Sequence, residues 1–177
     1  MNLLNPTHET YMRMALREAE KAYAIGEVPV GAVIVLDGRI IARAHNQVET
    51  LKDATAHAEI LAITQASAAL GDWRLQEATL YVTKEPCAMC AGAMVNAKLG
   101  QLVFGVTDPR SGCAGSAMDV TGFEGMLHRV PVLTGVLQEE SLMMLQCFFK
   151  ERRQARKDGT PDSKPGQAEL GDDPDLS

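Results

Sequence analysis

Residues 78–94 read ATLYVTKEPCAMCAGAM, and they are the most informative segment for the architecture of the chain. Its first six residues are rich in aliphatic, aromatic and β-branched side chains, which is typical of a strand. The strand runs into Pro86, and the small and apolar residues from Cys87 onward predict a helix that continues to about Gly100. A strand that leads directly into a helix is the repeating unit of α/β proteins.

The rest of the chain alternates between the same two patterns. Further strands are predicted over residues 30–36, 39–44, 102–106 and 132–136, with Asp37-Gly38 as the hairpin turn between the first two. Helices are predicted over residues 12–23, 56–70 (with Thr55 as a cap) and about 138–157. Five strands interleaved with helices predict an α/β domain in which helices pack on a central sheet.

Size and composition set the broad class. A chain of 177 residues with 46% hydrophobic content fits one globular domain, expected over residues 1–157 and ending in a basic helix. Residues 158–177 contain six acids, one base and many glycines and prolines, so a disordered acidic tail is expected there. Neither a signal-like N-terminus nor an apolar run of about 20 residues is present, which predicts a cytoplasmic protein without a membrane span.

Three residues are candidates for a metal site. Cys87 and Cys90 share one face at the start of a helix, and His57 opens another helix. Two thiolates and one imidazole suit a zinc ion that keeps its fourth position open, which is the catalytic arrangement. The alternative is that the cysteines are small core residues and the histidine a cap. His57-Ala58-Glu59, together with proline directly before Cys87, favours the metal.

Glu59 is the candidate catalytic residue. It lies two positions from His57 and is not needed as a ligand, so its carboxylate can move protons in a hydrolytic reaction. The alternative is an exposed acid that the helix N-terminus stabilises.

The chain resembles the cytidine-deaminase superfamily, and within it the bacterial tRNA-specific adenosine deaminases of the TadA type. The resemblance covers about residues 8–157, and the H-x-E…P-C-x-x-C pattern is the known signature of zinc nucleobase deaminases. It rests on these motifs: EVPVGAV at 27–33, TAHAE at 55–59, TLYVT at 79–83, EPCAMCAGAM at 85–94, and shorter matches that include Phe104-Gly105, Met118-Asp119-Val120, His128-Arg129 and Phe148-Phe149.

The resemblance implies a three-layer α/β/α fold with a central mixed five-stranded sheet. The implied reaction is hydrolytic deamination of adenosine to inosine at the wobble position of a tRNA anticodon stem-loop, with one zinc ion per subunit of a homodimer. It also implies that Asn46 contacts the flipped nucleoside and that Asp108 lies near the RNA backbone and ribose.

The last predicted helix carries the remaining substrate contacts. One stripe begins apolar at Leu142 and Leu145 and ends basic at Arg152 and Arg156. Its start is expected to pack on the domain, while Phe148, Phe149 and Arg152 are expected to contact RNA through stacking and phosphate binding. The net charge of −6 does not exclude RNA, because local patches decide phosphate attraction.

Lys84 departs from the family, which usually has an aliphatic residue there. It either faces solvent or brings a positive charge near the site and touches phosphate. We expect Lys84→Leu to keep metal binding and to change activity by less than about tenfold.

Two other functions remain open. A deaminase of a free base or nucleoside, such as guanine or cytosine, would use the same zinc and glutamate chemistry. A noncatalytic zinc module that binds nucleic acid would need a fourth ligand, for which the sequence places neither Cys113 nor another histidine.

Overall fold

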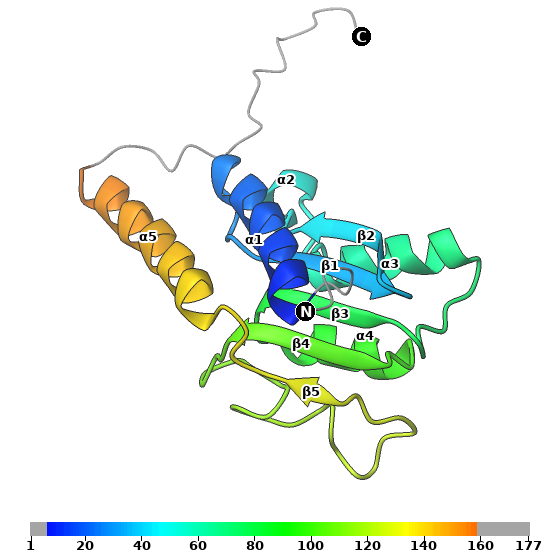
Figure 1. Ribbon diagram of the computed structural model, residues 1–177. Coiled ribbons are helices and arrows are strands. Elements are labelled where there is room, and N and C mark those ends of the chain that lie inside the picture. Colours follow the sequence, from blue (N-terminus) through cyan, green and yellow to red (C-terminus); the bar gives the residue numbers. More distant parts are fainter. Residues whose placement is uncertain (1–6, 159–177) are drawn as a thin grey trace, which may run out of the picture.

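The structure, a computed structural model, describes residues 7–158 (Figure 1). Over these residues five helices or helical turns are interspersed with the five strands of one sheet. In chain order the elements are α1 (His8–Ala24), β1 (Gly31–Leu36), β2 (Arg39–His45), α2 (Val48–Leu51), α3 (Ala58–Leu70), β3 (Thr79–Lys84), α4 (Ala88–Asn96), β4 (Gln101–Val106), β5 (Val132–Leu133) and α5 (Gln138–Lys157).

The sheet has the strand order β2-β1-β3-β4-β5. β1 pairs antiparallel with both β2 and β3, whereas β3, β4 and β5 run parallel. Parallel neighbours need a crossover connection, and α4 provides it between β3 and β4. The predicted mixed five-stranded sheet is therefore confirmed.

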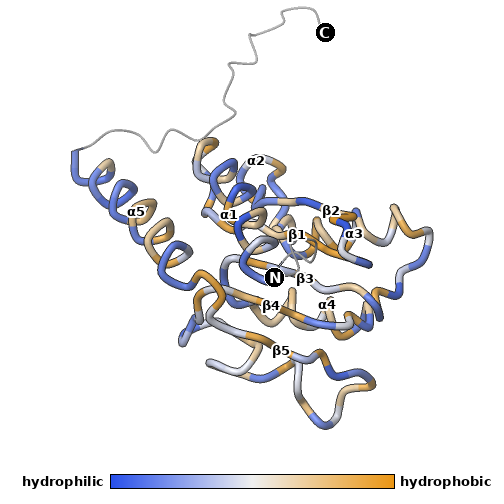
Figure 2. Tube along the Cα trace, viewed as in Figure 1, coloured by the Kyte–Doolittle hydropathy of each residue, from blue (hydrophilic) through white to orange (hydrophobic). Residues whose placement is uncertain are grey.

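Side chains of the central strands alternate between two buried layers. Ala32 and Ile34 of β1 pack in one core cluster with residues of α3 and α4, and Val33 and Val35 pack in a second cluster with residues of α1. Because successive strand residues point to opposite faces, strands that are apolar throughout need helices on both sides. Figure 1 shows α1 and α5 on one face and α3 and α4 on the other. Figure 2 shows orange, hydrophobic segments in β4 and long blue, hydrophilic segments on α5. The three-layer α/β/α prediction is confirmed.

The structure departs from the predicted elements in one strand and two helices. The helix predicted from Cys87 to about Gly100 ends at Asn96. The strand expected over residues 132–136 ends at Leu133, because Gly135 and Leu137 have φ angles of +82° and +51° that turn the chain toward α5. The short α2 was not predicted, since its four residues lack a helical apolar pattern. The predicted acidic tail lies outside the described residues except for Asp158. Within residues 7–158, none of the helices has the length and apolar character that a bilayer crossing requires.

Candidate active site

The local chain geometry places the candidate ligands at two helix starts. His57 is the N-cap residue of α3, and Cys87 is the N-cap residue of α4. Thr55, predicted as the cap of the first of these helices, instead donates from Oγ1 to Oδ1 of Asp53 at 2.7 Å. That prediction was wrong because the helix begins at Ala58, three residues beyond Thr55. A helix N-terminus favours negative charge, which suits a thiolate at Cys87.

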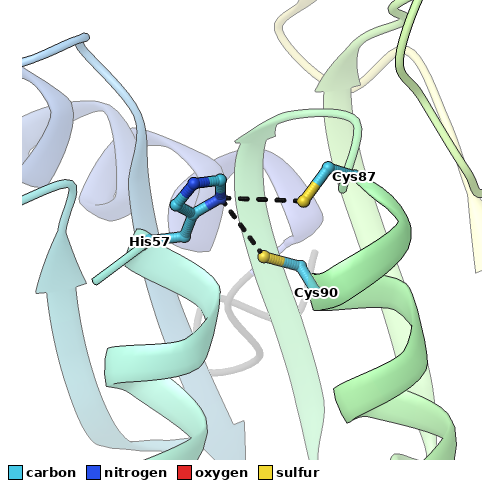
Figure 3. Close-up of side chains that lie close together, drawn as sticks. All are labelled: His57, Cys87 and Cys90. Atoms are coloured by element: carbon cyan, nitrogen blue, oxygen red, sulfur yellow. Dashed lines mark hydrogen bonds between the residues drawn. The ribbon is translucent and has the colours of Figure 1, made fainter. Parts of the chain in front are cut away.

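His57, Cys87 and Cys90 come together in the structure (Figure 3). Nδ1 of His57 lies 3.7 Å from Sγ of Cys87 and 3.5 Å from Sγ of Cys90. All three ligand atoms lie within 4.8 Å of one another. Ligand atoms in a tetrahedral zinc site with bonds of about 2.0–2.3 Å are separated by about 3.5–3.8 Å, so this group fits a zinc ion. Nδ1 is the histidine nitrogen that faces the thiols.

The pKa values of the two thiols are shifted in opposite directions. A hydrogen bond with Cys90 lowers the pKa of Cys87 to about 5. The same bond, followed by burial, raises the pKa of Cys90. One thiolate therefore forms at neutral pH, and binding of a cation would release the proton that Cys90 retains.

Glu59 lies in the first turn of α3 and is 4% exposed. Burial raises the pKa of its carboxyl, and the Cys90 thiol forms a hydrogen bond with it. A carboxyl whose pKa is raised accepts a proton more readily than an exposed glutamate does, which suits a group that takes and returns protons near neutral pH. The alternative of an exposed glutamate at a helix start is excluded.

A cavity of about 590 Å³ opens in front of these residues, a volume within the range of ligand-binding sites. Its lining brings together most of the residues predicted for the site. Those residues are Asn46, His57, Glu59, Cys87, Phe148, Phe149 and Arg152. Cys90 is fully buried behind the lining, and Asp108 is not among the lining residues. The contact predicted between Asp108 and the nucleotide stays a prediction.

Two buried glutamates, which were not assigned to the site from the sequence, form hydrogen bonds that fix residues around the cavity. Glu27 is 1% exposed and accepts hydrogen bonds from Nδ2 of Asn46 (3.1 Å) and from the backbone N–H (2.6 Å) and hydroxyl (2.9 Å) of Thr50. Glu27 therefore fixes the amide of Asn46. An acid directly before the apolar run that forms β1 is the signal that could have identified it.

Glu85 organises the loop that follows β4. It is 2% exposed, and its carboxylate accepts from the backbone N–H groups of Asp108 (2.8 Å), Ala114 (3.0 Å) and Ser116 (3.0 Å). A Cβ atom on Gly112 would lie 2.3 Å from this carboxylate, so glycine is needed there. Glu85 immediately precedes Pro86 and Cys87, so one segment holds both the loop and the ligand.

Helix α5 forms one wall of the cavity, although its buried face differs from the predicted stripe. The structure buries Ser141, Leu145 and Phe148, whereas Leu142 is 39% and Phe149 43% exposed. Phe148 was expected to reach RNA from the end of the helix, but it is only 6% exposed, because its ring packs edge-on against Tyr23 at 5.6 Å. A role of Phe148 in substrate binding stays a prediction.

Polar contacts also attach α5 to the domain. Nη2 of Arg152 donates to the carbonyl oxygen of Gly26, and its guanidinium lies 5.2 Å from the ring of Phe148. A hydrogen bond with Glu151 raises the pKa of Tyr23 to about 12 and links α1 to α5. Arg153 and Arg156 line the cavity beside Arg152, so three cations of α5 gather at its rim.

Comparisons with known proteins agree with this geometry. The model of the MafB19-like deaminase family matches residues 6–153. The tRNA-specific adenosine deaminase of Bacillus subtilis (strain 168) is 52% identical over 149 residues, which are 84% of this chain and 92% of that protein. The chain belongs to the MafB19-like deaminases, in the group of the tRNA-specific adenosine deaminases.

Solved structures of deaminases share the fold. One, from studies of A-to-I editing by tRNA:A34 deaminases at the wobble position of transfer RNA, is 45% identical with a TM-score of 0.74 and covers 76% of this chain and 98% of that chain. The guanine deaminase of Bacillus subtilis is 34% identical with a TM-score of 0.57 and covers 84% of this chain and 95% of its own. Membership of the deaminases confirms the resemblance found in the motifs, whereas the substrate has to be argued from this chain's own cavity.

Proposed function

We propose that this chain is a zinc-dependent enzyme that deaminates adenosine to inosine at the wobble position of a tRNA anticodon stem-loop. The observation that carries the proposal is the position of buried Glu59 beside the His57, Cys87 and Cys90 group, in a cavity that α5 lines with three arginines. The 52% identity to a protein named tRNA-specific adenosine deaminase supports the same substrate.

The metal expected here is zinc, held by Nδ1 of His57 and by the two sulfur atoms. The donor set and the separations of 3.5 and 3.7 Å support this assignment. When bound, zinc would supply a water molecule whose pKa falls from about 15.7 toward ~7.

Glu59 moves the protons of the reaction. It takes a proton from water as the oxygen attacks C6 of the adenine ring, and it delivers that proton to the ring nitrogen N1. It then transfers the second proton of the water to the departing amine, which leaves as ammonia, and inosine remains. Its burial keeps this carboxyl away from bulk water during both transfers.

Asn46 and α5 position the substrate in this account. Because Nδ2 of Asn46 bonds to Glu27, its carbonyl oxygen is the end of the amide oriented to accept from the nucleoside. Phe149 has an exposed ring, on which an unpaired base of the RNA can stack. Arg152, Arg153 and Arg156 attract the phosphates of the loop. An anticodon loop is single-stranded, which reduces the energy needed to flip the adenosine out.

We also propose that the enzyme works as a homodimer. The loop between β4 and β5 exposes large apolar side chains, of which Met118 and Phe123 are each 59% exposed and Leu127 is fully exposed. Such a surface is typical of a protein–protein contact. Sedimentation at micromolar concentration tests this, and a monomer throughout would contradict it.

The second candidate is deamination of a free base, and the 34% identity to a guanine deaminase favours it. The arginines of α5 distinguish the two substrates, because a free base has no phosphate for them to bind.

The test is incubation of the purified protein with an anticodon stem-loop that carries a wobble adenosine, in parallel with free adenosine, guanine and cytosine. Mass spectrometry detects the product in each case. Inosine in the stem-loop alone supports the proposal. If a free base is deaminated and the stem-loop is not, the proposed deamination mechanism is retained and the proposed tRNA substrate is rejected.

A further inference from the structure

Lys84 is the last residue of β3 and directly precedes Glu85, Pro86 and Cys87. Its Nζ atom lies 2.5 Å from Oδ2 of Asp108. The side chains of the pair are 27% and 17% exposed, so they form a partly buried ion pair rather than a surface one. An ion pair with this exposure holds its geometry better than two fully solvated side chains.

The carboxylate of Asp108 is fully engaged within the protein. Its Oδ2 accepts from Nζ of Lys84 and from the hydroxyl of Ser111 at 2.5 Å. Its Oδ1 accepts from the backbone N–H groups of Arg110 at 3.0 Å and Ser111 at 3.2 Å. Burial opposes the ionisation of Asp108, but the hydrogen bonds from Lys84 and Ser111 outweigh it and hold the pKa of Asp108 below its usual range.

The two ends of this ion pair differ in their access to the cavity. Lys84 and Ser111 line the cavity, whereas Asp108 does not. Asp108 is also held through its backbone, because its N–H donates to buried Glu85. The carboxylate therefore acts as a fixed support, and the ammonium is the charge presented to a bound molecule.

An ammonium group has three N–H donors, and Asp108 receives one of them. An RNA strand that places its adenosine in this cavity carries a phosphate on each side of that nucleotide. A compact ammonium held in one position is a good phosphate ligand. Of the other acids that line the cavity, Glu27, Glu59 and Glu85 are at most 4% exposed. The fourth, Glu49, is exposed, but its carboxylate lies 3.7 Å from Nζ of Lys52, which offsets its charge.

We propose that Lys84 is a substrate-binding residue that holds an RNA phosphate next to the target adenosine, with Asp108 as the positioning residue for its ammonium. The inference rests on the proposed function, since it presumes an RNA strand in the cavity. It assigns a phosphate contact to the end of β3, apart from the arginines of α5.

The experiment measures the affinity of the full chain for an anticodon stem-loop over a series of salt concentrations. All binding variants carry Glu59→Ala, so that the RNA is not converted during the titration. Lys84→Met is expected to weaken binding about threefold to eightfold near ~0.1 M salt. The slope of log affinity against log salt should also fall by about 0.7, the value for one lost phosphate contact on a single strand. Lys84→Arg should keep the slope.

Arg39→Met is the matched control. Arg39 is an exposed cation at the start of β2, whereas Asn46 follows the other end of that strand. Arg39 does not line the cavity. The slope for Arg39→Met should equal that of the parent chain. An unchanged slope in Lys84→Met would overturn the inference.

A double variant distinguishes phosphate binding by Lys84 from the alternative that Lys84 only neutralises the negative charge of Asp108. If Lys84 binds phosphate, Lys84→Met/Asp108→Asn stays as weak as Lys84→Met and keeps the reduced slope. Recovery of affinity and slope in the double variant would mean that Lys84 only cancels the charge of Asp108, which overturns the proposal. Inosine formation by the unmodified chain is scored separately: its absence, with a slope that still depends on Lys84, would reject the proposed reaction and retain the phosphate contact.

Discussion

Asn46 donates from Nδ2 to Oε2 of Glu27 over 3.1 Å, and Glu27 is itself almost fully buried. The same carboxylate accepts two hydrogen bonds from Thr50. This one acid therefore connects the end of β2 to the short α2 and fixes the orientation of a cavity-lining amide.

Glu27→Gln should weaken both folding and substrate binding. The new amide presents N–H donors to groups that are themselves donors, so at least one hydrogen bond is lost in a buried site, at a cost of about 1–3 kcal/mol in the free energy of unfolding. The KM for the stem-loop should rise more than kcat falls, because Glu27 acts through Asn46. Urea unfolding and steady-state kinetics measure these effects. Glu77→Gln, which changes an exposed acid, is the control. An unchanged KM would contradict the positioning role.

Cys90→Ser should remove most of the bound metal, whereas Cys113→Ser should not. Both thiols are buried, but only Cys90 lies within reach of His57. Sγ of Cys113 contacts the carbonyl oxygen of Ser111 at 3.5 Å instead. Elemental analysis of the purified proteins should give about one zinc per chain in the parent and in Cys113→Ser. Equal zinc content in both variants would show that the three-residue group is not the metal site.

Gly31→Ala should destabilise the fold strongly. A Cβ atom at this position would lie 2.1 Å from the carbonyl oxygen of Ala15 and 2.3 Å from the backbone nitrogen of Ala19, and neither backbone atom of α1 can move alone. We expect a loss of about 1–3 kcal/mol or more in unfolding free energy. Gly92→Ala is the matched control, because it lies in α4 with nothing within 4 Å of its Cβ position. It should gain about 0.5–1 kcal/mol. Equal effects in urea unfolding would contradict the close packing of α1 on β1.

Asp108 should stabilise the fold in a pH-dependent way. Its pKa is lower in the folded chain than the ordinary value of 3.8, so its stabilisation is present above about pH 4 and is lost as the pH falls toward the folded value. Asp108→Asn should therefore cost about 1–2 kcal/mol near pH 7, and the difference from the parent should shrink near pH 3. Urea unfolding at both pH values measures this. The exposed Glu20→Gln should show no such trend, and a constant penalty for Asp108→Asn would contradict the ion pair.

The sequence was sufficient for those parts of the fold and site that depend on local pattern. Strand β3 follows from its β-branched and aromatic residues, and the helix after Cys87 follows from proline and small residues. The ligand spacing follows from helix geometry. The start of α3 was misassigned because threonine is the better intrinsic cap, yet Thr55 bonds to Asp53 in the loop.

Tertiary contacts explain what the sequence could not predict. The hydrogen-bond partners of buried Glu27 and Glu85 come from segments 19 to 31 residues away, and no local pattern encodes such pairs. The pattern along α5 could not show that Phe148 is buried and Phe149 exposed, because the two are adjacent aromatic residues and both were expected to contact RNA. Only the packing against Tyr23 decides between them.

The most direct test of the account is inosine formation in a wobble-adenosine stem-loop by the unmodified chain and by Glu59→Gln, each with its zinc content determined. Glutamine keeps the size and polarity of the side chain but cannot carry the proton. We predict about one zinc per chain in both proteins and a rate at least about a hundredfold lower in the variant. A zinc-loaded Glu59→Gln variant that forms inosine at the parent rate would contradict the central claim that this buried carboxyl moves the protons of the reaction.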